Sequence, residues 1–103
     1  MATITLTNAA FAATPGANQT VTVRYRLTSD LDVPGSYTTV TTTAVVQPNG
    51  TFVTPVVISG LLSNTSYTVW VTNNCGGNGV KKAFVTPLPG CVDITDVTGT
   101  VAD

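Results

Sequence analysis

Hydrophobic and polar side chains alternate along most of this chain with the period of two that is typical of half-buried β-strands. The clearest example is residues 21–28, where every second side chain is large and apolar: Val21, Val23, Tyr25 and Leu27. The same period predicts four further strands, over residues 37–46, 51–58, 67–72 and 80–86. No segment is predicted to be helical.

The first strand is less regular than the others. It begins at Ile4 and Leu6, but the alternation breaks before Phe11, so we expect a bulge or kink near residues 8–10. Turn signals separate the remaining strands: Pro34-Gly35, Gln47-Pro48-Asn49-Gly50 and the polar, glycine-rich residues 73–79. The last of these is predicted to close a hairpin.

The strand predicted over residues 51–58 contains a proline. Its inward-facing set is predicted to be Phe52, Thr54, Val56 and Ile58, with Pro55 on the other face. Because proline cannot donate a hydrogen bond to a neighbouring strand, this strand should lie at a sheet edge or carry a bulge.

Composition agrees with an all-β domain. The 103 residues include 21 threonines and 16 valines, and these β-branched side chains pack well on a pleated sheet. Histidine, the usual general base and the commonest metal ligand, is absent. We therefore expect a non-catalytic protein without a cofactor.

Charge narrows the classes of partner. The chain has five aspartates and only four basic residues, Arg24, Arg26, Lys81 and Lys82. These are too few for the basic surface that nucleic-acid binding requires. No apolar run approaches the ~20 residues of a membrane-spanning helix, and residues 1–13 lack the pattern of a signal peptide. We expect neither nucleic acid nor membrane as a partner. A protein made in the cytosol and assembled later fits this pattern, as does a module cut from a longer secreted protein.

Residues 58–71 carry a family resemblance. The stretch Ile58-Ser-Gly-Leu-Leu-Ser-Asn-Thr-Ser-Tyr67-Thr-Val-Trp-Val71 resembles the E-to-F region of fibronectin type III domains, I-x-G-L-x-P-G-T-x-Y-x-V-x-V. Asn64 stands where the family has a glycine and is a suitable residue for the positive φ that this turn requires. The resemblance implies an immunoglobulin-like β-sandwich of about seven strands, with Tyr67 as the tyrosine corner whose hydroxyl bonds to backbone upstream.

The two ends of the chain depart from that family. Only about nineteen residues precede the strand at residues 21–28, which leaves room for one strand where the family has two. Residues 91–101 resemble the opening strand of a type III domain, placed after the last strand. We therefore divide the chain into a sandwich, residues 1–90, and a C-terminal strand or arm, residues 91–103. The arm could complete the sheet of its own chain or of a neighbouring copy, or be a loosely ordered tail.

Few residues are candidates for chemistry. Cys75 and Cys91 are predicted to lie at opposite ends of one strand, farther apart than the ~7 Å between Cα atoms that a disulfide tolerates. Asp30 and Asp32 sit two apart in a turn, but calcium normally needs six or more oxygen ligands, so a solvated turn is the favoured interpretation. Three Asn-x-Ser/Thr patterns are attributed to the high threonine content.

Trp70 is the residue whose type and predicted position disagree. If Tyr67, Val69 and Val71 face the core, Trp70 points outward, on the same face as Arg24 and Arg26 of the neighbouring strand. This arrangement is either a self-contained cation–π stack, an anchor for a protein partner or a platform for a glycan. The candidate interface residues are Trp70, Arg24, Arg26, Lys81, Lys82, Asp93 and Asp96.

Two classes of function follow. The first is a structural interaction module, an auxiliary (decoration) capsid or fibre protein on the virion surface of a tailed phage, bound to other subunits of the lattice or self-associated by strand donation. The alternative is an extracellular carbohydrate-binding or spacer module from a secreted bacterial glycosidase or adhesin. Both rest on fold-level analogy and on the threonine-rich, weakly charged composition.

Overall fold

The computed structural model describes residues 2–75, 77–88 and 96–102. Within them the fold is all-β, with one turn of 3-10 helix, η1 (Pro34–Ser36), and no α-helix. The strands are β1 (Ala2–Asn8), β2 (Gln19–Leu27), β3 (Thr38–Val46), β4 (Thr51–Leu61), β5 (Ser66–Asn73) and β6 (Val80–Val85). All five of the predicted interior strands and the first strand are therefore confirmed, each within a few residues of its expected bounds.

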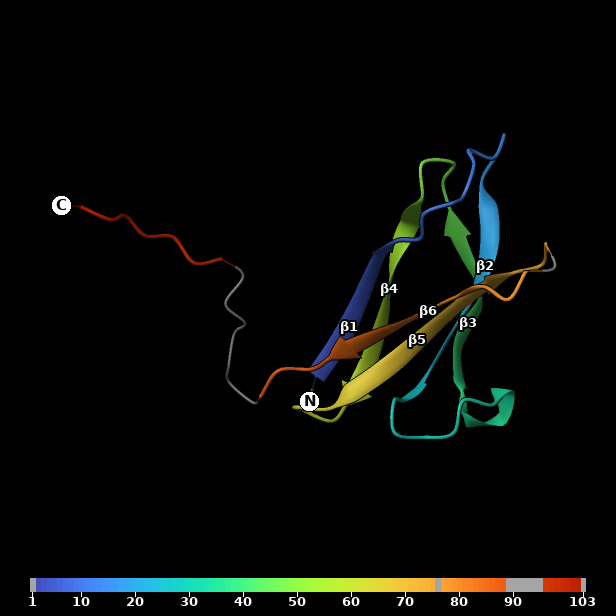
Figure 1. Ribbon diagram of the computed structural model, residues 1–103. Coiled ribbons are helices and arrows are strands. Elements are labelled where there is room, and N and C mark those ends of the chain that lie inside the picture. Colours follow the sequence, from blue (N-terminus) through green and yellow to red (C-terminus); the bar gives the residue numbers. More distant parts are fainter. Residues whose placement is uncertain (1, 76, 89–95, 103) are drawn as a thin grey trace.

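The six strands form one antiparallel sheet in the order β1-β4-β3-β2-β5-β6 (Figure 1). The link between β4 and β3 is a single pair, Val46 with Phe52, whereas β2 pairs with β5 over seven consecutive residues. The sheet curls until its two end strands, β1 and β6, line opposite sides of one cleft. The expected seventh strand is not among the described residues, and residues 89–95 of the predicted arm lie outside them.

The core fills the inside of this curled sheet. Every strand except β6 contributes at least one buried apolar side chain: Ile4, Leu6, Val21, Val23, Ala44, Val46, Phe52, Val56, Ile58, Leu61, Tyr67 and Val69. Phe84 of β6 is half-buried against this cluster. All of these residues lie between positions 4 and 84, so the described C-terminal residues 96–102 contribute nothing to the core.

Strand β4 carries the irregularity that its proline predicted. Between the pairs Leu6–Val56 and Asn8–Thr51 the register shifts, so β4 holds more residues than β1 opposite it. Pro55 lies in this stretch. The prediction that Thr54 faces the core is wrong, because Thr54 lies within the bulged stretch and is exposed. The other three residues of the predicted inward-facing set are buried: Phe52, Val56 and Ile58.

A second shift in the register of β4 lies at Gly60. It falls between the pairs Ile4–Ile58 and Ala2–Leu61. Gly60 adopts a φ of 74°, which a residue with a Cβ rarely does, and the extra residue turns Leu61 into the core. The positive φ expected at Asn64 is confirmed at 50°.

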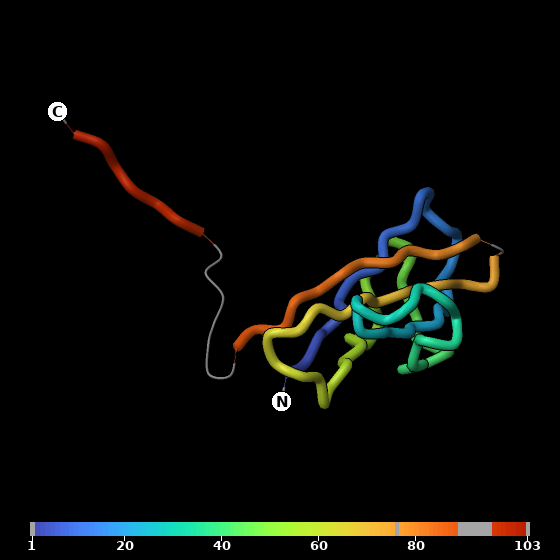
Figure 2. Tube along the Cα trace, turned by 60° about the horizontal axis from the view of Figure 1, so that its bottom comes forward, coloured from blue at the N-terminus to red at the C-terminus, as the bar shows by residue number. Residues whose placement is uncertain are grey.

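Residues 96–102 form no strand, and in two views they lie away from the sheet (Figures 1 and 2). Val97 and Val101 are 88% and 99% exposed. The segment therefore buries none of its apolar side chains against the body.

Candidate functional site

One row of side chains crosses three strands on the outer face of the sheet. Arg24 of β2 pairs with Trp70 of β5, which pairs in turn with Lys81 of β6. The Arg24 guanidinium lies 5.3 Å from the centroid of the Trp70 ring, and the Lys81 ammonium lies 4.9 Å from it. The indole thus has a cation from each neighbouring strand, within the range of a cation–π attraction.

Tyr37 adds a second aromatic ring to this row. It follows η1, in the connection between β2 and β3, and its ring centroid lies 4.9 Å from that of Trp70 at an interplanar angle of 52°. The Lys81 ammonium lies 5.7 Å from the Tyr37 ring. Trp70 and Tyr37 are both half-buried, so each ring keeps one part open to solvent. We call Arg24, Asp32, Tyr37, Trp70 and Lys81 the Trp70 face.

Asp32 holds the Trp70 face together electrostatically. Its Oδ1 accepts hydrogen bonds from the Lys81 ammonium at 2.9 Å and from the Tyr37 hydroxyl at 3.1 Å. These two bonds, the Lys81 bond foremost, lower the pKa of Asp32 below its ordinary 3.8, while the bond from Lys81 to Asp32 raises the pKa of Lys81. Asp32 is thus an ion-pair partner in this structure, in a turn that anchors the aromatic rings.

Arg26 has a different role from the one its sequence position suggested. Its side chain is only 9% exposed, beneath Tyr37, and its Nε donates to the Tyr37 hydroxyl at 3.1 Å. One terminal nitrogen donates to three carbonyl oxygens, those of Leu27, Thr28 and Asp30. Arg26 therefore fixes the turn that carries Asp32 and offers little surface to a partner.

The Trp70 ring is held at its edge as well as on its faces. Its Nε1 donates to the carbonyl oxygen of Asn78 at 2.8 Å. Gly79, next to it, has a φ of 71°, and a Cβ there would stand 3.0 Å from the indole nitrogen and too close to the carbonyl of Val71. The hairpin loop thus positions Trp70, and the ring is preorganised rather than free to rotate.

Lys82 does not belong to the Trp70 face. It pairs with Val69, whose side chain is buried, so it points to the inner side of the sheet. Its ammonium lies 5.2 Å from the ring of Phe84. The candidate interface residues are therefore divided between two surfaces, because Lys81 and Lys82 lie on opposite faces of β6.

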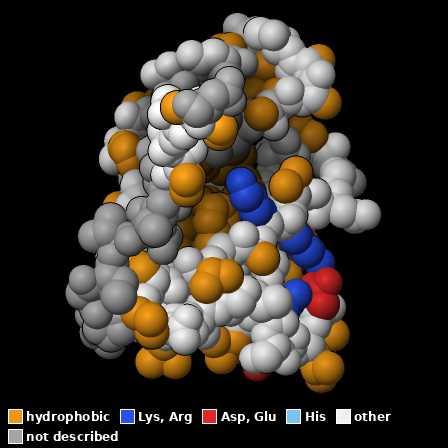
Figure 3. All heavy atoms as spheres, turned by 60° about the vertical axis from the view of Figure 1, so that its left-hand side comes forward, with side chains coloured by type: hydrophobic (Ala, Val, Ile, Leu, Met, Phe, Trp, Pro, Cys, Tyr) orange, Lys and Arg blue, Asp and Glu red, His pale blue; other side chains and the backbone are white. Residues whose placement is uncertain are grey.

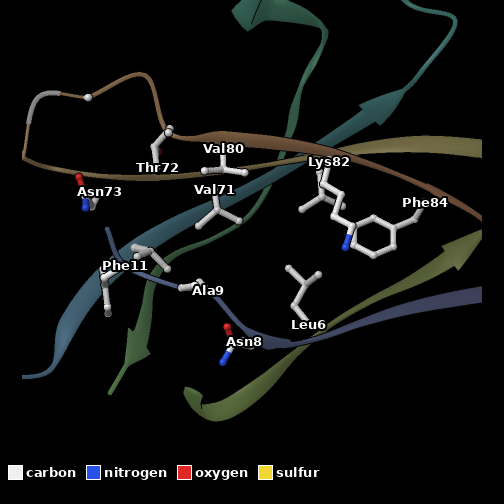
Figure 4. A pocket seen from close by; sticks show the side chains of 15 residues that line it. Leu6, Asn8, Ala9, Phe11, Val71, Thr72, Asn73, Val80, Lys82 and Phe84 are labelled. Atoms are coloured by element: carbon white, nitrogen blue, oxygen red, sulfur yellow. The ribbon is translucent and has the colours of Figure 1, made fainter. Parts of the chain in front are cut away.

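The inner face of β6 borders a cleft, the β1–β6 cleft, with a volume of about 470 Å³. Leu6 and Phe11 line it on one side, and Val71, Val80 and Phe84 line it on the other, as Figure 4 shows. The lining is mainly apolar, and Lys82 reaches over it from β6. In the space-filling view the surface is hollowed, with hydrophobic side chains inside the hollow and a basic side chain above it (Figure 3).

Tyr67 lies at the end of β5, buried, with its ring edge-on to Tyr25. Its hydroxyl accepts a hydrogen bond from the backbone N–H of Leu62 at 2.9 Å, five residues upstream. Buried Thr86 ties the same turn from the other side, since its hydroxyl donates to the carbonyl of Leu62 at 2.6 Å and accepts from the N–H of Thr65 at 3.1 Å. Together these bonds satisfy the backbone of the turn between β4 and β5.

The remaining candidates lie outside these two surfaces. Asp96 is exposed and accepts a hydrogen bond from the N–H of Val97 at 2.8 Å. Asp93 and Cys91 fall outside the described residues. Cys75 is an exposed free thiol in the β5–β6 loop. Among the residues that the structure describes, no three acidic or cysteine side chains gather as metal ligands.

Sequence reasoning missed the parts of the site that come from loops. Tyr37 lies in an irregular connection, where no periodicity predicts a direction, and the sequence favours a solvated turn at Asp32 over a calcium site, with no ion pair to Lys81. The one available signal was an aromatic residue, Tyr37, at the end of a polar turn that precedes a strand. By contrast, the period of two was sufficient to place Lys81 and Lys82 on opposite faces.

Comparison with known proteins found no family model, no curated protein and no solved structure that matches this chain. In the described part of the chain, no helix is long and apolar enough to cross a membrane. The interpretation of function therefore rests on the two surfaces themselves.

Proposed function

We propose that this protein is a non-catalytic structural module that binds other protein subunits through its Trp70 face. The observation that carries the proposal is the preorganised row of Arg24, Trp70 and Lys81, with Tyr37 beside it, on an open sheet face. Tryptophan, tyrosine and arginine are the residue types enriched among the residues that dominate protein–protein binding. Because the hairpin loop and Asp32 already hold the rings, little side-chain entropy is lost when a partner covers them.

We also propose that the fold is a fibronectin type III-like sandwich. The strand order supports this, because β1 with β4 can be taken as one layer and β3-β2-β5-β6 as the other, joined by the single Val46–Phe52 pair. The bond from Leu62 to the Tyr67 hydroxyl supports the tyrosine corner. On this interpretation the strand that would cover the outer edge of β1 is missing from the described residues.

The specific assembly that we propose is the virion of a tailed phage, with this chain as an auxiliary capsid or fibre protein on its surface. The support is compositional: the chain is rich in threonine, has 9% charged residues and carries a net charge of −1. A decoration protein needs no more than a binding face and a stable fold.

The test is co-sedimentation of the fluorescently labelled protein with purified tailed-phage particles stripped of their auxiliary proteins. We expect Trp70→Ala to weaken binding by about tenfold or more, the loss of a central anchor. Val57→Ala, which removes an exposed valine from β4, is the matched control and should bind like the parent. Full-strength binding by Trp70→Ala would overturn the assignment of this face, and no binding by the parent protein would overturn the virion assignment.

The alternative function, binding of carbohydrate, is favoured by one observation. The Trp70 and Tyr37 rings present two open aromatic surfaces, and Asp32, Arg24 and Lys81 supply polar groups at their edges. A sugar ring can stack on such a surface while its hydroxyls bond to the rim. A glycan array distinguishes the two proposals. A glycan that binds the parent protein and the Val57→Ala control but not Trp70→Ala would favour carbohydrate over protein.

A further inference from the structure

The two end strands of the sheet leave the β1–β6 cleft open. Among the described residues β1 pairs only with β4, and β6 pairs only with β5, so each strand has one edge whose N–H and C=O groups have no strand partner. The cleft between them is lined by Leu6, Phe11, Val71, Val80 and Phe84. Val80 is 67% exposed in this position. An open edge beside an apolar cleft is the arrangement that accepts an added strand.

Residues 96–102 have the pattern that such a cleft would take. Val97 and Val101 have the same parity, with Gly99 between them, and Thr98 and Thr100 occupy the opposite parity. In an extended chain the two valines would therefore point into the cleft and the two threonines outward, like the exposed threonines of β1. The segment is seven residues long, as is β1.

Charge favours the same pairing. Residues 89–103 contain Asp93, Asp96 and Asp103 and no basic residue, a charge of −3, which leaves +2 on residues 1–88 because the whole chain carries −1. Lys82 reaches over the cleft and is exposed, and it forms no ion pair with a described residue. The opposite net charges of the C-terminal segment and the body favour their encounter.

We propose that the β1–β6 cleft binds residues 96–102 of a second copy of this chain, which add a strand to the free edge of β1. This proposal deepens the proposed function, since it names one protein partner of the module, and it uses a surface distinct from the Trp70 face. A second copy is favoured over the same chain because the segment buries nothing in its own molecule: Val97 and Val101 remain 88% and 99% exposed. Pairing between copies would cover these valines, Val80 and the edge of β1 together.

The first experiment measures self-association of the full chain by light scattering and sedimentation over a range of concentrations. We expect a concentration-dependent species larger than the 10.6 kDa monomer. Val97→Asp with Val101→Asp should raise the dissociation constant about tenfold or more, because charges would enter the apolar cleft. Thr98→Asp with Thr100→Asp adds the same charge on the outward face and should have a much smaller effect. A monomer at every concentration would overturn the proposal, and so would equal effects of the two double variants.

The acceptor side has its own matched pair on β6. Val80 and Val85 are 67% and 66% exposed, but Val80 lines the cleft and Val85 does not. We expect Val80→Asp to reduce self-association and Val85→Asp to leave it unchanged. Lys82→Glu should reduce it as well, while Lys81→Glu should not. If Val85→Asp or Lys81→Glu were the damaging variant, a different surface would be responsible.

The second experiment distinguishes copies by cross-linking, in a background with both native cysteines changed to serine. One preparation carries Thr98→Cys and the other Thr5→Cys on β1, and the two are mixed under mild oxidation. We expect a disulfide-linked dimer of the two variants, and a much lower yield when Thr42→Cys of β3 replaces Thr5→Cys. A chain that carries both Thr5→Cys and Thr98→Cys tests the alternative. If it forms an intramolecular disulfide at every dilution, the cleft binds residues 96–102 of the same chain and the proposal is overturned.

These results are separable from those on the Trp70 face. Trp70→Ala should self-associate like the parent protein, because the indole lies on the outer face of β5 and lines no part of the cleft. If the protein does not self-associate but Trp70→Ala loses particle binding, strand donation is rejected and the proposed function stands. If the protein self-associates through the cleft but Trp70→Ala binds particles at full strength, the proposed function of the Trp70 face is rejected and strand donation stands.

Discussion

Lys81 and Lys82 are adjacent in the chain but lie on opposite faces of β6, one ammonium 4.9 Å from the centroid of the Trp70 ring and the other 5.2 Å from that of Phe84. The two side chains therefore separate the Trp70 face from the β1–β6 cleft. Their environments also differ, since Lys81 is paired with Asp32 and Lys82 borders an apolar surface. A substitution of Lys81 therefore tests the Trp70 face, and the same substitution of Lys82 is its control.

The first prediction uses this pair. Trp70 is the single tryptophan, so its fluorescence reports on its own surroundings. We expect Lys81→Met to shift the emission spectrum of the folded protein, because it removes a cation at 4.9 Å and releases Asp32 and Tyr37. Lys82→Met should leave the spectrum unchanged. Equal spectra for the parent and Lys81→Met would mean that Lys81 does not occupy this position in solution.

The second prediction concerns pH. Hydrogen bonds from Lys81 and Tyr37 lower the pKa of Asp32 in the folded protein, so the interactions of the carboxylate are present above the ordinary value of 3.8 and are lost as pH falls through the lower folded value. Trp70 fluorescence should therefore show an acid transition with its midpoint below 3.8. The raised pKa of Lys81 keeps the pair intact through neutral pH, up to the loss of the Lys81 charge above 10.5.

Asp32→Asn is the control for the acid transition. The amide at position 32 cannot titrate, so the fluorescence transition should disappear. Circular dichroism should show that the variant remains folded. A transition that persists in Asp32→Asn would assign it to another aspartate, and a midpoint above 3.8 would contradict the hydrogen bonds at Asp32.

How far the sequence predicts this molecule depends on the element. In β2 and β5 strict alternation of Val21, Val23, Val69 and their neighbours is sufficient, because both strands lie in the middle of the sheet and pair in unbroken register. Alternation alone places Trp70 beside Arg24. In β4 the same reasoning fails at Thr54, because Thr54 lies in a bulge whose position depends on how β1 pairs with the strand.

The loop contribution to the Trp70 face could not be predicted in the same way. Tyr37 reaches Trp70 because η1 and the Arg26 bonds bend the connection between β2 and β3 back over the sheet. No local pattern encodes this contact, which joins residues 33 positions apart, and the β1–β6 cleft likewise depends on which strands end the sheet.

The third prediction concerns Tyr67. Tyr67→Phe should lower the free energy of unfolding by about 1–2 kcal/mol, because the part-buried hydrogen bond from the Leu62 N–H to the Tyr67 hydroxyl is lost. Tyr25→Phe is the matched control: its ring contacts Tyr67, but among the described residues its hydroxyl makes no hydrogen bond, so we expect a change below about 0.5 kcal/mol. Denaturant unfolding measures both. An unchanged midpoint for Tyr67→Phe would argue against the tyrosine corner.

The fourth prediction concerns the thiols. Cys75 is exposed, so it should react with a thiol reagent in the folded protein without reductant. After denaturation, again without reductant, we expect two thiols per chain. A Cys75–Cys91 bridge would contradict the expected separation of these residues. Mass spectrometry would reveal it as a single chain that takes up no thiol reagent until it is reduced and then takes up two.

The fifth prediction tests whether the β5–β6 loop positions the Trp70 ring. Gly79 has a φ of 71°, and a Cβ there would stand 2.7 Å from a methyl carbon of Thr72 and 3.0 Å from the indole nitrogen. Gly79→Ala should therefore lower the free energy of unfolding by about 1–3 kcal/mol through backbone strain and crowding. It should also move the ring, since the bond from Trp70 Nε1 to the Asn78 carbonyl would be displaced.

Gly77→Ala is the control in the same loop, because a Cβ at that position meets nothing closer than 4.0 Å. We expect its stability and its Trp70 emission to match those of the parent protein, while Gly79→Ala shifts the emission and loses part of the binding that depends on Trp70. If Gly79→Ala is destabilised but its emission and binding are unchanged, the loop supports the fold and does not orient the ring. In that case the cations of Arg24 and Lys81, together with the Tyr37 ring, would be sufficient to hold Trp70 in place.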